Sequence, residues 1–311
     1  MAKAKKLAQP KYEHEYEKRF KFAIYEKDGE IARVTLNRPE KLNAFGMARD
    51  RVDWEGRQLQ LDFMAALDKA EYDDEVKVVI IKGAGRSFSA GFDISRVYHV
   101  YEDFDEEPGK RRPSQRARLE VDRVFAEQNQ RILLFPKITI AQVHGHCIGQ
   151  GASVAEACDI TIVADDAHIS HAEQRLGFAG SGENLLPLFL SVGYKRAREM
   201  LLIGEAIDGK EAERIGWAAK SVPPEKLEEE VNRIARQIAL LPRDGIAIGK
   251  ASNHLILDIL GATQGWLQCY LTHTLFTNLR FEPDEYSFIK ERRDTGARAA
   301  FHKRDERYEQ I

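Results

Sequence analysis

The stretch Val143 to Glu173, VHGHCIGQGASVAEACDITIVADDAHISHAE, carries the strongest local pattern in this chain. Glycines interrupt its first part, and glycine allows backbone geometry and close contacts that other residues resist. The small residues from Ala152 to Cys158 favour a short helix, and the β-branched run from Asp159 to Ala164 favours a buried strand. The stretch therefore predicts a turn, a short helix, a strand and a second turn.

Polar groups fall at both of these turns. Gln150 lies where the predicted helix begins, and the first N–H groups of a helix have no partner within it. Such N–H groups bind an anion or stabilise a developing oxyanion. A carboxylate, Glu173, comes just after the next predicted strand. The pattern indicates a site that combines backbone donors with one carboxylate.

The same order of strand, turn and helix recurs elsewhere in the chain. Phe22 to Asn37 predicts a hairpin, with Lys27-Asp28-Gly29 as its turn. Gln58 to Ala70 has one apolar face at helical spacing, while Val76 to Lys82 and Ile138 to Val143 favour buried strands. We therefore predict an α/β fold.

Composition narrows the function classes. The chain has 311 residues and a net charge of −3 with acidic and basic residues interspersed, which does not favour nucleic-acid binding. No apolar run approaches the length of a membrane span. The 3 cysteines are widely spaced, which argues for a reducing compartment, here the cytoplasm, and against a disulfide framework or a metal site. Residues 1–20 predict a flexible N-terminal arm.

Three blocks in order resemble the crotonase (enoyl-CoA hydratase/isomerase) superfamily. HGHCIGQGASVAEACDI followed by ISHAEQRLG is similar to its signature region. RSFSAGFDI, from Arg86 to Ile94, is similar to its F-x-A-G-x-D-I segment, and LNRPEKLNA, from Leu36 to Ala44, to its N-R-P-x-x-x-N-A segment. The resemblance implies a spiral of ββα turns over residues 21–222. It also implies a helical region over 223–311 that completes an acyl pocket and joins subunits into a homotrimer or homohexamer.

The resemblance further implies an acyl-CoA substrate and a backbone oxyanion hole. By position, the N–H groups of Phe92 and Gln150 would hold the thioester oxygen, although many relatives have glycine where this chain has Gln150. Two aimed donors would stabilise the enolate that forms when the thioester is attacked or deprotonated. The neighbouring residues with expected substrate or CoA contacts are Ala90, Gly91, Asp93 and Gly149.

Acid–base chemistry depends on two positions that hold glutamates in a typical hydratase. Glu173 retains one of them, and Ser153 replaces the other. Glu173 is therefore expected to be the principal acid and base, while Ser153 either binds water or substrate or only helps the helix to pack. A serine is not a base by itself at neutral pH. His171, two residues before Glu173, is a further candidate for substrate contact.

The expected function is that of an acyl-CoA-thioester lyase of enoyl-CoA hydratase type, with no cofactor because coenzyme A is part of the substrate. Serine followed by glutamate at this spacing is also similar to the hydroxycinnamoyl-CoA hydratase-lyases, which release an aldehyde and acetyl-CoA. The turn at Asn184 resembles that branch, and Tyr270 is a candidate phenol-binding group, whereas Tyr98 is one residue out of place. Three readings remain open: an enoyl-CoA isomerase, a crotonase-fold thioester or ring hydrolase, and a non-catalytic binding protein.

Overall fold

The computed structural model describes residues 20–46, 55–94, 115–177, 184–276 and 281–309. The predicted N-terminal arm up to residue 19 and the candidate Tyr98 lie outside these ranges.

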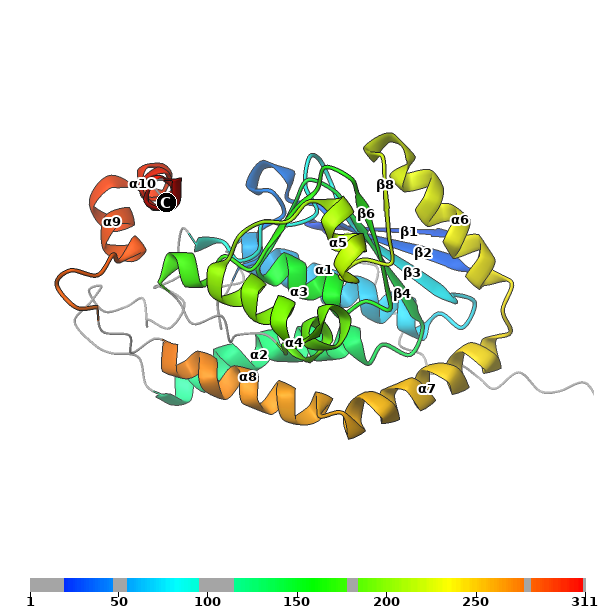
Figure 1. Cartoon of the computed structure of the whole chain (residues 1–311). Coiled ribbons are helices and arrows are strands. Elements are labelled where there is room, and N and C mark those ends of the chain that lie inside the picture. Colours follow the sequence, from blue (N-terminus) through cyan, green and yellow to red (C-terminus); the bar gives the residue numbers. More distant parts are fainter. Residues whose placement is uncertain (1–19, 47–54, 95–114, 178–183, 277–280, 310–311) are drawn as a thin grey trace, which may run out of the picture.

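The described chain is organised around a 6-stranded sheet with the order β1-β2-β3-β4-β6-β8 (Figure 1). The first two strands form an antiparallel hairpin, as predicted, and the remaining neighbours run parallel. Gly29 turns this hairpin with a φ of +58°, a conformation that suits glycine. The strands are β1 (Ala23–Asp28), β2 (Ile31–Leu36), β3 (Val78–Gly83), β4 (Ile138–Val143), β6 (Ile160–Ala164) and β8 (Lys220–Val222).

A second, shorter layer of extended chain follows the strands of the large sheet. Strand β5 (His146–Ile148) pairs in parallel with β7 (His168–Ser170), and single bridges join Phe45 to Phe92 and Ser89 to Cys147. A large-sheet strand, a second-layer segment and a helix thus repeat along the chain. This arrangement confirms the predicted α/β spiral of ββα turns. The helices that follow are α1 (Glu55–Tyr72), α2 (Gln115–Leu133), α3 (Gln150–Glu156) and α4 (Leu186–Ile203).

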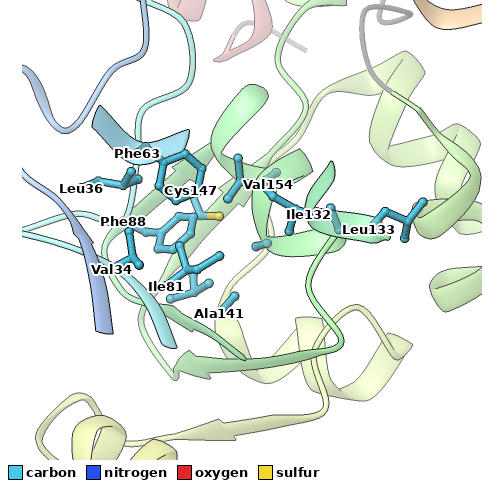
Figure 2. Packing of buried hydrophobic residues seen from close by; sticks show 14 of the residues in the cluster. Val34, Leu36, Phe63, Ile81, Phe88, Ile132, Leu133, Ala141, Cys147 and Val154 are labelled. Carbon is cyan, nitrogen blue, oxygen red and sulfur yellow. The ribbon is translucent and has the colours of Figure 1, made fainter. Parts of the chain in front are cut away.

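Both faces of the large sheet are covered, which explains why apolar residues dominate the parallel strands β3, β4 and β6. Val79 and Ile81 of β3 face the second layer and α1, where Figure 2 shows Phe63, Phe88 and Cys147 within the same cluster. The alternate residues of β3, Val78 and Ile80, pack instead against α6 (Leu227–Ala239). The period-2 alternation of strand side chains therefore builds two cores from one strand.

The C-terminal part of the described chain is helical. Helix α8 (Ala262–Phe276) packs along α2, and α9 (Phe288–Thr295) and α10 (Ala297–Glu309) contact Leu176 through Phe288 and Ala300. None of the helices in the described ranges is long and apolar enough to cross a membrane. All three cysteines are free thiols. The remaining short and long helices are η1 (Pro39–Lys41), η4 (Gln174–Leu176), α5 (Gly209–Ile215), η5 (Pro224–Lys226) and α7 (Arg243–Ile259).

Asn43 connects the turn after β2 to the turn after β3. Its side chain is fully buried, and its Oδ1 accepts from the Arg38 N–H at 2.8 Å. Its Nδ2 donates to the carbonyl oxygens of Ala84 at 2.9 Å, Ser87 at 2.8 Å and Phe88 at 3.2 Å. One amide thus satisfies backbone groups that would otherwise be buried without partners. Asn43 therefore fixes the loop that leads from β3 into the second layer.

Asn43→Ala should reduce the free energy of unfolding by about 2–4 kcal/mol, because it leaves several buried backbone groups unpaired. The φ of +55° at this position adds strain to any residue that favours negative φ. Urea unfolding measures the change. The control is Lys41→Ala, because Lys41 is an exposed residue in the same turn. An Asn43→Ala protein as stable as the Lys41→Ala protein would contradict this role.

Candidate active site

The site lies where two backbone segments of the second layer approach each other closely. A Cβ added to Gly91 would lie 2.5 Å from the Ile148 carbonyl oxygen and 3.4 Å from the Gln150 amide nitrogen. Only glycine permits this contact, and its φ of +83° also favours glycine. The structure therefore brings the Gly91-Phe92 segment against the Ile148-to-Gln150 segment, as the sequence predicts.

Two main-chain N–H groups in these segments have no protein acceptor within the described residues. The amides on either side of Phe92 are occupied, because the Asp93 N–H donates to the Phe45 oxygen at 2.7 Å and the Gly91 N–H to Ser89 Oγ at 3.2 Å. The N–H of Phe92 itself and the N–H of Gln150 at the start of α3 take part in no such bond. These are the two donors that the sequence predicts for an oxyanion hole.

Glu173 follows β7 closely in the chain and is the N-cap residue of η4. Its carboxylate packs against Gly149. A Cβ added to Gly149 would lie 2.5 Å from Glu173 Oε1. The other carboxylate oxygen, Oε2, is buried and has no hydrogen-bond partner. An unpaired buried carboxylate oxygen is costly and uncommon in folded proteins, and such exceptions point to function. Glu173 thus presents a proton-accepting atom beside the residue that precedes Gln150.

Ser153 belongs to the same helix as Gln150. It lies one turn after Gly149, and its N–H donates to the Gly149 oxygen at 3.0 Å. Its side chain is 5% exposed, and its Oγ has no hydrogen-bond partner. A buried hydroxyl without a partner is available to water or to a substrate group. Whether Ser153 binds water or substrate or only helps the helix to pack stays a prediction.

The structure places His171 in a buried polar cluster with two residues that the sequence reasoning missed. Its Nε2 lies 2.8 Å from Glu156 Oε1, which also accepts from Trp217 Nε1 at 2.7 Å. Both members of the His171–Glu156 pair are nearly inaccessible. The cluster ties the end of α3 to the segment that carries Glu173. The expected substrate contact of His171 stays a prediction, and no pattern in the sequence signals this pairing.

Asp93 and Ala90 hold the loop that contains Phe92. Asp93 Oδ2 lies 3.0 Å from Arg38 Nη1, an ion pair with both side chains largely buried, and Arg38 Nη1 also donates to the Ala44 oxygen at 3.0 Å. The Ala90 N–H donates to the Leu42 oxygen at 2.8 Å. These contacts join the RSFSAGFDI block to the LNRPEKLNA block. Direct contacts of Asp93 or Ala90 with coenzyme A stay predictions.

Tyr270 lies on α8, which packs along α2. Its ring packs against Trp266, with centroids 5.7 Å apart. Within the described residues, none of its contacts reaches Glu173 or Phe92. Asn184, from the turn that resembles the hydratase-lyases, donates to the Ala262 oxygen at 3.0 Å and so fixes the start of α8. The phenol-binding role of Tyr270 stays a prediction.

The described part of the chain contains no group of three or more histidine, cysteine, aspartate or glutamate side chains arranged to hold a metal ion. Within the described ranges, the groups that the site brings together are two backbone donors, one carboxylate and one hydroxyl.

Gly149→Ala should lower turnover by about 10²-fold, because the new methyl group displaces the Glu173 carboxylate from its seat. Steady-state kinetics with an enoyl-CoA thioester measures the loss. Gly29→Ala is the matched control, since Gly29 has a similar φ of +58° but no atom within 4 Å of an added Cβ. Equal activity in the two variants would contradict the close packing of Glu173 on Gly149.

Comparison with known proteins agrees with this geometry. The sequence profile of the enoyl-CoA hydratase/isomerase family matches residues 26–294. Similar proteins include the putative enoyl-CoA hydratase EchA13 of Mycobacterium tuberculosis, 31% identical over 269 residues, which are 82% of this chain and 80% of that one. A hydroxycinnamoyl-CoA hydratase-lyase from Pseudomonas fluorescens is 28% identical over 239 residues, or 77% of this chain and 79% of that one.

A solved structure supports the same relationship. The crystal structure of an enoyl-CoA hydratase/isomerase from Xanthobacter autotrophicus Py2 superposes with a TM-score of 0.79 at 29% identity and covers 93% of this chain and 99% of that chain. The profile, the relatives and the fold agree with the three sequence blocks. The chain belongs to the enoyl-CoA hydratase/isomerase family of the crotonase superfamily.

Proposed function

We propose that this protein adds water to a 2-enoyl-CoA thioester, with Glu173 as the acid–base carboxylate. The observation that carries the proposal is the meeting of three groups that have no hydrogen-bond partner among the described residues: the N–H groups of Phe92 and Gln150, and Oε2 of Glu173. A hydratase reaction uses these groups together, because charge develops on the thioester oxygen while a proton moves at the neighbouring carbons.

The reaction assigns one role to each group. Glu173 takes a proton from water as the water oxygen bonds to the β-carbon of the substrate. The electrons of the carbon–carbon double bond move onto the thioester oxygen, where the two N–H groups stabilise the negative charge. Glu173 then returns the proton to the α-carbon. The unpaired hydroxyl of Ser153 orients the water or a substrate hydroxyl. No cofactor is needed, because coenzyme A is part of the substrate.

A second candidate is a hydratase-lyase that cleaves the hydrated product into an aldehyde and acetyl-CoA. Ser153 in place of a second carboxylate favours it, as does the similarity to the Pseudomonas fluorescens hydroxycinnamoyl-CoA hydratase-lyase. Loss of a proton from the β-hydroxyl group and cleavage of the bond between the α- and β-carbons would again form an enolate in the same oxyanion hole. The two candidates share the site and differ in the acyl group and in the cleavage step that follows hydration.

Mass spectrometry after incubation in D₂O with crotonyl-CoA, a 3-enoyl-CoA and feruloyl-CoA tests the proposal. We expect water addition with deuterium at the α-carbon. An aldehyde with acetyl-CoA would support the lyase candidate instead. A moved double bond without water addition would identify an isomerase, and free coenzyme A a thioester hydrolase, and either would contradict both candidates.

Glu173→Gln should lower turnover by about 10²- to 10⁴-fold, since it removes the group that transfers the proton. Glu205→Gln is the matched control, because Glu205 is an exposed carboxylate whose ion-pair partner, Arg175, lies in η4 beside Glu173. Isothermal titration with butyryl-CoA should show that Glu173→Gln still binds a thioester. Unchanged turnover in this variant would remove Glu173 from its proposed role.

We also propose self-association as a homotrimer or homohexamer. Large apolar side chains are exposed on several of the helices after α3, including Leu190 and Tyr194 on α4 and Leu255 and Ile259 on α7. Exposed apolar surface of this kind favours protein–protein contact. Sedimentation equilibrium should give three or six times the mass of 35.4 kDa, and a monomer at micromolar concentration would contradict the proposal.

A further inference from the structure

One helix outside the glycine-rich segments contacts both oxyanion donors. The ring of Phe125 on α2 meets the ring of Phe92 edge to face, with centroids 4.9 Å apart and an interplanar angle of 87°. One turn further along α2, Asn129 is hydrogen-bonded to the side chain of Gln150. Helix α2 thus touches the residues whose main-chain N–H groups are unpaired.

The contact between Asn129 and Gln150 is a reciprocal pair of amides. Gln150 Nε2 donates to Asn129 Oδ1 at 2.8 Å, and Asn129 Nδ2 donates to Gln150 Oε1 at 3.3 Å. The two residues are only 4% and 1% exposed. Each amide supplies a donor and an acceptor to the other. A buried amide that loses such a partner stays desolvated without a hydrogen bond, which destabilises the folded state. The pair therefore holds the Gln150 side chain in one orientation.

The local geometry explains why a side chain is accommodated at Gln150 but not beside it. A Cβ at Gly149 would meet the Glu173 carboxylate, and a Cβ at Gly151 would lie 2.6 Å from the Ser89 oxygen. Gln150, between them, directs its side chain toward α2 instead. The Gln150 side chain is thus anchored to α2, which restricts the backbone that carries the donor.

Helix α2 is itself held on two other sides. Arg131 Nη2 lies 2.8 Å from Glu71 Oε2 on α1 and also contacts Asp68. Thr274 Oγ1 on α8 donates to Asp122 Oδ2 at 2.9 Å. These contacts fix α2 between the N-terminal half of the chain and the C-terminal helices. A support anchored at both ends transmits a defined position to the groups packed on it.

We propose that Asn129 is a positioning residue of the oxyanion hole, which orients the Gln150 N–H through the paired amides. Phe125 supports the other donor segment through its contact with Phe92. This inference rests on the proposed function, because it assigns Asn129 a role only if the two N–H groups bind a thioester oxygen. Asn129 needs no contact with the substrate.

The test measures polarisation of the thioester carbonyl rather than activity alone. The probes are two unreactive saturated thioesters, [1-¹³C]butyryl-CoA and [1-¹³C]3-phenylpropanoyl-CoA, and the readout is the carbonyl stretching frequency of the bound probe. Hydrogen bonds from the two N–H groups should lower this frequency in the wild-type protein. Asn129→Leu should reverse part of the shift and lower kcat by about 10- to 10²-fold, with a much smaller change in KM, since it misplaces one donor.

Two further variants make the outcome decisive. Asn129→Asp still accepts from Gln150 Nε2 but cannot donate to Oε1, so it should give a smaller loss of the shift, and it replaces Asn129→Leu if that variant does not fold. Glu127→Gln, exposed on the same helix, is the control and should leave the shift and kcat unchanged. A wild-type shift that persists in full in both Asn129 variants would overturn the inference alone. Bound probes with no shift in the wild-type protein would overturn the proposed function, and this inference with it.

Discussion

Close approach of main-chain segments is the constraint on which the site depends. The segment of Gly91 lies against Ile148 and Gln150, and the Glu173 carboxylate lies against Gly149. A side chain at Gly91 would clash with the Ile148 backbone, and one at Gly149 would displace the Glu173 carboxylate. Both positions also have a positive φ, which favours glycine. The approach brings two unpaired N–H groups and one unpaired carboxylate oxygen to the same place. The chemistry of the site follows from this packing.

The surrounding fold holds these segments at a fixed separation. The second layer positions them through single bridges such as Phe45 to Phe92 and Ser89 to Cys147, which are weak by themselves. Asn43 and the Arg38–Asp93 ion pair fix the first segment, while the Glu156 cluster with His171 and Trp217 fixes the second. Buried hydrogen bonds of this kind rigidify the segments that they join. Rigid support from several directions is what a preorganised oxyanion hole requires.

Much of the fold was predictable from the sequence, because the spacing of apolar residues and the residue types of each segment indicate which positions are buried. The hairpin at β1 and β2 has turn residues between two strand-like runs, and β3, β4 and β6 have the apolar, β-branched composition typical of buried strands. The second layer was harder to predict from the sequence, since its strands are short and some of its pairings are single bridges. Its path is set by tertiary contacts that leave no periodic signal.

The site divides in the same way. Glycine spacing and the three blocks identified Phe92, Gln150 and Glu173, and the structure brings their segments together. Sequence reasoning missed Asn129 and Glu156, because a lone polar residue on an amphipathic helix has no distinctive pattern. Sequence reasoning also predicted only a ligand-binding role for Asp93. In the structure its carboxylate pairs with Arg38, a contact between residues far apart in the chain. Pairings between distant side chains are decided by the fold.

The most direct test of this account is a crystal structure of the protein with bound butyryl-CoA. The account predicts the thioester oxygen at about 2.7–3.1 Å from both the Phe92 and the Gln150 nitrogen atoms, the range expected of an oxyanion hole. It also predicts the Glu173 carboxylate beside the α- and β-carbons. A thioester oxygen bonded to neither nitrogen, or an acyl chain directed away from Glu173, would contradict the account.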